Sequence, residues 1–433
     1  MRGEASAAED PAGNGGRKSA GEDDPRIARL AKERRRDIRL DFFRGLGMFI
    51  ILIAHTPWNS WNRWIPARWG YSDATEIFVF CSGAAAASAF LKLFEARGWG
   101  VGTARVAYRI WQLYWCHIGV FFATLAALIV VDQTLVDAHR NYVGVLNLSR
   151  FVNDPAAFLP SLFTLTYVPN YFDILVMYMV ILALMPVMVA LSWIRPWVAL
   201  PFSALLWAAS SQPWIAYIDV PVIEFLSLPA EPVGNPRGWF FNPFAWQLIF
   251  FTGFAFAVGW LPKPPANPWL IGVASFIVLI CPALDPDGVP IRRLVRQIDW
   301  LYEPIKAFND ATGALHSKSF FGIFRYVHFL ALAYLVWLAA GEGGRRLPQT
   351  GIGGRVVTVV RRVGQQSLAV FIASLLLARL LGGGMLELGL LNPEGRWPQI
   401  SLPVTIAVNL PGFALLVGVA YIARYFRNPP WKT

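Results

Sequence analysis

Ten apolar segments, most of them long enough to cross a bilayer as a helix, constrain this chain more than any other feature. A transmembrane helix needs about 20 mostly apolar residues, and it satisfies its own backbone hydrogen bonds where water is absent. The segments predict an all-α, polytopic membrane bundle of about ten transmembrane helices, in which the fifth and seventh are short. The expected spans are about Ile38–Trp58, Asp73–Phe94, Arg105–Val131, Tyr171–Trp193, Trp197–Ser211, Pro243–Leu261, Pro268–Ala283, Phe321–Ala340, Val363–Leu381 and Leu402–Tyr425.

The composition agrees with a membrane protein and argues against other classes. Of the 433 residues, 56% are hydrophobic and 15% are charged, whereas a soluble domain carries roughly a quarter charged residues. The net charge of +11 is better explained by lysines and arginines in cytoplasmic loops, which contact anionic lipid headgroups, than by nucleic-acid binding. The three cysteines lack the spacing of metal ligands, so we expect no metal and no disulfide framework.

The distribution of charge predicts the orientation. With the N-terminus inside, the loops that face the cytoplasm are mostly short and basic. Most outside charges fall in two long segments, Asp132–Asn170 and Leu284–Ser319, and long loops translocate largely regardless of charge. We therefore expect both ends in the cytoplasm, with a disordered polar tail over residues 1–37, a membrane-embedded domain over 38–426 and a short tail over 427–433.

The first span carries ionisable residues that do not belong in lipid. Arg44 and His55 are 11 residues apart, which places them on one helix face about 16 Å apart, and Asp41 joins that face. An arginine near the cytoplasm suits phosphate binding, and a histidine in the outer half suits general-base work. Alternatively, Asp41 and Arg44 form a structural ion pair and His55 hydrogen-bonds a neighbouring helix.

The second span begins outside, near the level of His55. Its first residues include Asp73 and Glu76, either of which could orient the imidazole. Further along, Ser82 and Gly83 belong to a run of small residues, for which we expect the structural role of close helix approach.

Polar groups in later spans complete two layers, one basic and cytoplasmic, the other outer and mixed. Arg105 and Arg109 open the third span as an i,i+4 pair, either to bind phosphate or as positive-inside anchors. Arg379, near the outer end of the ninth span, could simply extend to the membrane surface. Candidates for substrate binding in the outer layer are Asp173, Trp246, Gln247, Arg325 and His328.

Several of these residues carry a family resemblance. Three features resemble the acyltransferase family 3 superfamily: Arg44 and His55 with ten residues between them, the run Phe78–Gly83, and the Arg105/Arg109 pair. Four further segments resemble its OpgC branch, the succinyltransferases of osmoregulated periplasmic glucans: Tyr167–Leu175, Phe241–Gln247, Arg325–Leu330 and Gly364–Leu368. The resemblance runs from about Asp37 to Phe426. One departure is that Ala369–Ser374 lacks the histidine found there in many members, a role that His328 could take.

The resemblance implies an acyltransferase of the bacterial inner membrane. Its co-substrate would be an acyl-CoA in the cytoplasm, with succinyl-CoA expected, and its acceptor a hydroxyl of a periplasmic glucan. Arg44, Arg105 and Arg109 would bind the donor phosphates, His55 would be the general base, and Arg325 would bind the succinyl carboxylate.

Two other classes of protein remain open. A transporter or exporter of an anionic or glycan solute would also need intramembrane charges, although we find no clear inverted repeat of the kind such proteins often have. A sensor or structural membrane protein would not explain polar groups in two layers.

Overall fold

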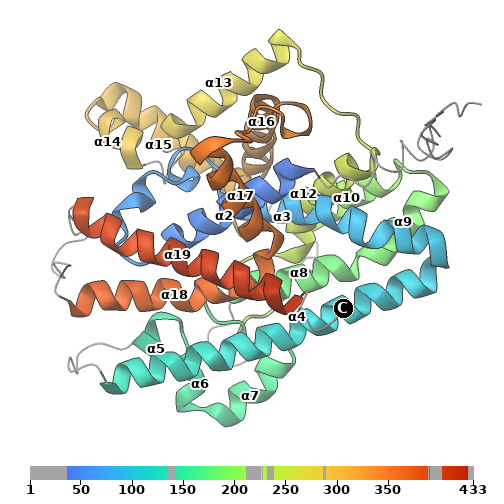
Figure 1. Ribbon diagram of the computed structural model, residues 1–433. Helices are drawn as coiled ribbons and strands as arrows, with labels where there is room; N and C mark the ends of the chain where they lie inside the picture. Colours follow the sequence, from blue (N-terminus) through green and yellow to red (C-terminus); the bar gives the residue numbers. More distant parts are fainter. Residues whose placement is uncertain are drawn as a thin grey trace, which may run out of the picture. The chain divides into compact units, whose positions relative to one another are not determined.

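The computed structural model describes residues 37–134, 142–210, 226, 228–231, 238–285, 289–388, 390 and 402–427. Within these ranges the secondary structure is helical apart from an isolated bridge between Pro229 and Gly238. The predicted all-α class is therefore confirmed for the described part of the chain (Figure 1).

Helices account for most of the described residues. In the first half they are α2 (Ile38–His55), α3 (Ala74–Ala86), α4 (Lys92–Thr134), α5 (Tyr142–Val145), α6 (Ser149–Asn153), α7 (Pro155–Phe163), α8 (Asp173–Ala183), α9 (Met185–Ile194) and α10 (Ala199–Ser210). In the second half they are α12 (Pro243–Val258), α13 (Pro268–Leu284), α14 (Val289–Val295), α15 (Asp299–Thr312), α16 (Ile323–Ala340), α17 (Gly351–Gln365), α18 (Ser367–Glu387) and α19 (Leu402–Arg427).

In the part of the chain that the structure describes, five helical stretches are long and apolar enough to cross a membrane. Three shorter apolar helices, α10, α12 and α13, accompany them. Helix α2 has 18 residues but carries three charged ones, Arg39, Asp41 and Arg44. The five stretches are Ala74–Gln133, Asp173–Ile194, Ile323–Ala340, Ser367–Met385 and Leu402–Arg427.

The second and third expected spans are joined by helix rather than by the expected loop. A π-helical turn, η3 (Ala87–Leu91), leads directly from α3 into α4. The path is interrupted at Gly98, which has φ 83° and ψ 171°. Glycine adopts this conformation without a side-chain clash, so the chain changes direction there while its neighbours stay helical.

The core is built where α3 and α12 pack against each other, with α8 and α10 also against α12 (Figure 1). The contact between α3 and α12 is reciprocal: a Cβ atom on Gly83 would collide with the Phe250 carbonyl, and one on Gly253 with the Phe80 carbonyl. Small residues allow such backbone approach in membrane bundles, and this approach packs α3 directly against α12.

Large apolar side chains also cover much of the outside. On α13, Trp269 is 80% exposed and Leu279 is 76% exposed. Similar side chains are exposed on α4 and α19, including Trp111, Trp115 and Ile422. Contiguous apolar surface of this kind suits a lipid environment and not water.

Helix α17 lies in a segment expected to be a cytoplasmic loop. It buries Val357, Val360 and Val363 on one face, a spacing of three residues that follows the helical period. Its Gly364 lies so close to α2 that a Cβ atom would meet the carbonyl of Asp41. Helix α17 therefore supports the first half of α2.

Candidate active site

The N-terminal end of α3 is fixed by a capping box. The Asp73 carboxylate accepts a hydrogen bond from the Thr75 backbone N–H at 2.6 Å, and the Glu76 carboxylate accepts one from the Asp73 backbone N–H at 2.8 Å. An acidic residue at the N-cap and a glutamate three positions later satisfy backbone donors that a helix start leaves unpaired. Both carboxylates are therefore held in place locally.

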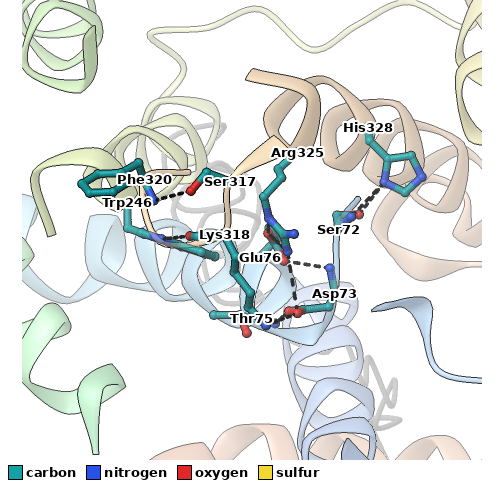
Figure 2. Close-up of polar contacts among 10 residues, drawn as sticks. All are labelled: Ser72, Asp73, Thr75, Glu76, Trp246, Ser317, Lys318, Phe320, Arg325 and His328. Carbon is teal, nitrogen blue, oxygen red and sulfur yellow. Dashed lines mark hydrogen bonds and ion pairs between the residues drawn. The ribbon is translucent and has the colours of Figure 1, made fainter. Parts of the chain in front are cut away.

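The same carboxylates form a buried charge network with α16 and the segment before it (Figure 2). Arg325 donates from Nε and Nη2 to Glu76 Oε1, at 2.8 and 2.7 Å, and its Nη2 lies 3.7 Å from Asp73 Oδ2. Lys318 forms an ion pair with Asp73. Two cations thus balance two anions, as buried charges require.

His328 stands one helical turn after Arg325 and contacts the loop that follows α2. Its Nδ1 lies 2.7 Å from Ser72 Oγ and accepts from the Ser72 backbone N–H at 3.2 Å (Figure 2). The loop fits tightly because a Cβ atom on Gly70 would collide with the imidazole. His328 therefore holds the end of the loop that leads from His55 to Asp73.

Three other expected substrate-binding residues hold backbone segments around this network. Trp246 donates from Nε1 to the Lys318 carbonyl at 2.9 Å (Figure 2). Gln247 ties α12 to α10 through Ser203, at 2.6 and 2.7 Å. Asp173 accepts from the Phe240 backbone N–H at 3.1 Å.

His55 lies apart from the two carboxylates and lines a small cavity. The structure shows no hydrogen bond between His55 and Asp73 or Glu76. Its ring instead meets Tyr171 edge-on, with ring centroids 4.8 Å apart. The other side chains that line this His55 cavity are Thr124, Leu146, Phe172, Leu375 and Arg379.

Three of the residues that line the His55 cavity each have a buried polar atom without a hydrogen-bond partner in the described structure. These atoms are His55 Nδ1, Thr124 Oγ1 and Arg379 Nη2. Buried polar groups in folded proteins are almost always paired, by protein or by water. An imidazole, a hydroxyl and a guanidinium left unpaired around one cavity are the donors and acceptors that a polar ligand would use.

The inner polar layer is built around the first half of α2. Arg44 is buried and donates from Nη2 to the Cys81 carbonyl of α3 at 2.8 Å, while its Nε has no partner. Asp41 accepts from Gln365 at 3.0 Å. Arg109 bonds Gln112 at 3.2 Å, and Arg105 is exposed above the Tyr108 ring.

The structure adds residues that the sequence did not single out for the site. Thr124 is an ordinary residue within an apolar span, and Tyr171 is one of many aromatic residues near an expected span end. One signal does mark Tyr171, because its φ of 72° is unusual for a residue with a side chain. Lys318 was counted only as a loop charge, and Arg379 only as a residue that could reach the surface.

Known proteins provide an independent comparison. A family model described as OpgC protein matches residues 36–428. Neither a search of curated proteins nor a search of solved structures gives a significant match. The family match includes the charge network, the His55 cavity and the inner polar layer. The chain therefore belongs to the OpgC family, and this membership indicates a transferase role in the modification of osmoregulated periplasmic glucans.

Proposed function

We propose that this chain is an O-acyltransferase of the bacterial inner membrane, which transfers a succinyl group from cytoplasmic succinyl-CoA to a hydroxyl of a periplasmic glucan. Family membership supports the class of reaction. The observation that carries the proposal is the His55 cavity, with its unpaired imidazole nitrogen, hydroxyl and guanidinium. Polar groups of the sugar and of the acyl donor would supply the partners that these atoms lack.

In the proposed reaction, His55 is the general base. With Nδ1 in its unprotonated form, the imidazole takes the proton of a sugar hydroxyl, and the oxygen attacks the thioester carbonyl carbon. The carbon–oxygen bond forms, the carbon–sulfur bond breaks, and the leaving thiolate takes the proton from the imidazolium. The products are a sugar ester and free CoA.

The other expected residues take supporting roles in this proposal. Arg44, Arg105 and Arg109 bind the donor phosphates on the cytoplasmic side. Asp73 and Glu76 act through the charge network, which fixes the end of the loop that begins after His55. Asp173, Trp246, Gln247 and His328 shape the acceptor side by holding the backbone around it.

We also propose that ten helical segments cross the membrane, with both ends in the cytoplasm. The segments are α2, α3, α4, the α8–α9 pair, α10, α12, α13, α16, α18 and α19. The short, basic loops on the expected inner side support this orientation. It places Arg44 toward the cytoplasm and His55 in the outer half.

Reporter fusions test the orientation. We expect reporters after Thr433 and within Gly341–Val363 to be cytoplasmic, and reporters within Leu284–Ser319 to be periplasmic. Paired alkaline phosphatase and green fluorescent protein fusions distinguish the two compartments. A periplasmic C-terminus would reverse the direction from Arg44 to His55 and contradict the proposed route of the acyl group.

Substitution of Arg44 tests donor binding. Arg44→Ala is expected to raise the Michaelis constant for acyl-CoA roughly 10- to 100-fold, the effect of losing charge-assisted hydrogen bonds. Arg105→Ala and Arg109→Ala should have smaller effects, and Arg44→Lys should rescue poorly because lysine lacks the planar fork. Arg424→Ala, at an exposed position on α19, is the control. If all three variants bind CoA like the parent, the inner layer does not bind donor.

Purified protein in vesicles tests the function itself. Given succinyl-CoA on one side and glucan on the other, an acyltransferase forms sugar ester and releases CoA, which mass spectrometry and a thiol assay detect. A transporter moves solute across the vesicle membrane and forms no ester. Solute movement without ester would favour the transporter hypothesis over the proposed reaction.

A further inference from the structure

Arg379 is a buried arginine without an acidic partner among the described residues. It belongs to α18, is 8% exposed, and its guanidinium carbon lies 4.3 Å from the centre of the Tyr171 ring. The Tyr171 ring provides a cation–π contact, which satisfies none of the guanidinium N–H groups. The Nη2 atom has no hydrogen-bond partner.

The comparison with Arg325 shows why Arg379 is the better anion-binding residue. Arg325 already contacts Glu76 and lies near Asp73, so its charge is balanced inside the protein. Glu387 lines a neighbouring cavity with Arg379 and accepts a hydrogen bond from the Tyr142 hydroxyl at 2.8 Å. A buried arginine without a carboxylate partner destabilises the protein, and an anionic ligand would offset that cost.

Arg379 also lies beside the proposed base. The His55 ring centroid lies 4.8 Å and the Arg379 guanidinium carbon 4.3 Å from the centroid of the Tyr171 ring. The distance between the imidazole centroid and the guanidinium carbon therefore cannot exceed the sum of these two distances. The two carboxyl carbons of a succinyl group are about 4 Å apart when extended, from three carbon–carbon bonds of about 1.5 Å. An extended succinyl group with a hydrogen bond of about 3 Å at each end has a length comparable to the upper limit of this separation.

We propose that Arg379 binds the free carboxylate of a dicarboxylic acyl group and thereby selects the acyl donor. This inference rests on the proposed acyltransferase function. With the far carboxylate on the guanidinium, the thioester carbon lies toward His55, where the sugar hydroxyl attacks. An acyl group without a second carboxylate leaves Arg379 unpaired and is therefore a poorer substrate.

The test compares succinyl-CoA with acetyl-CoA as donors. We expect Arg379→Gln to lower the ratio of kcat/KM for succinyl transfer to kcat/KM for acetyl transfer roughly 10- to 100-fold, as for loss of a charge-assisted pair. Arg379→Lys keeps the charge without the planar fork, so it should restore part of the succinyl preference. Arg293→Gln, at an exposed position in α14, should behave like the parent for both donors.

Two kinetic outcomes would overturn the inference. Equal losses with both donors would assign Arg379 to a structural or general catalytic role, and an unchanged succinyl preference would show that it does not select the donor. Binding of succinyl-CoA and acetyl-CoA to the His55→Gln protein, with and without Arg379→Gln, provides a readout that needs no turnover. If the parent protein transfers no acyl group, the proposed function fails. A binding preference for succinyl-CoA that disappears in Arg379→Gln would still support the carboxylate site, and no such preference would reject it.

Discussion

Glucans from a His55→Gln strain are expected to lose their succinyl groups, with transfer falling about 10²–10⁴-fold. This is the range for loss of a positioned general base. A sugar hydroxyl is a poor nucleophile until its proton is removed, and histidine is the side chain that titrates near neutral pH. Glutamine keeps a similar size and some hydrogen bonding but cannot accept the proton. Mass spectrometry of the glucans measures the effect.

The controls separate chemistry from folding. Donor binding should persist in His55→Gln, because the proposed phosphate-binding residue Arg44 lies about 16 Å away along the helix. His316→Gln should retain full transfer, since His316 stacks on Tyr71 outside the His55 cavity. A structural histidine would instead lose protein level and donor binding together. Normal succinyl content at an equal protein level would rule out the catalytic role of His55.

Local sequence patterns predicted much of the helical framework. The apolar segments located α8, α12, α16 and α19, because length and hydrophobicity largely determine where a membrane helix forms. They did not predict α17. Its sequence has arginines among the valines, and these arginines lower the mean hydropathy of the segment. Its amphipathic period was present in the sequence, but a search for long apolar runs does not detect it.

The partners of the polar residues could not be predicted in the same way. Helical periodicity shows that Arg44 and His55 share a face, but it does not show which helix packs against that face. Glu76 and Arg325 are 249 positions apart, and no local pattern links them. The same holds for Arg379, which reaches His55 only through the packing of α18 beside Tyr171.

Glu76→Gln is expected to destabilise the protein by about 3–5 kcal/mol, the range for removal of one partner from a buried ion pair. Glu76 is fully buried and accepts two hydrogen bonds from Arg325. Glutamine can still cap the Asp73 N–H but removes the carboxylate closest to Arg325, and Asp73 lies farther away at 3.7 Å. The midpoint of thermal unfolding in detergent measures the loss.

Glu342→Gln is the matched control, because its ion pair with Arg345 is on the surface, with the two side chains 84% and 77% exposed. Exposed pairs contribute at most about 1 kcal/mol, so this variant should unfold like the parent. An unchanged midpoint in Glu76→Gln would show that the buried pair does not stabilise the N-terminal end of α3.

A double variant distinguishes loss of the charge pair from loss of packing. Arg325→Met in the Glu76→Gln background removes the buried cation that has lost its partner. Replacement of a buried pair by apolar side chains is often neutral, so the double variant should regain much of the lost stability. If the double variant loses as much stability as Glu76→Gln and Arg325→Met lose together, the network acts through packing. The charge network anchors the end of the loop that begins after His55. The Glu76→Gln variant should therefore also lower kcat more than it raises the Michaelis constant for donor.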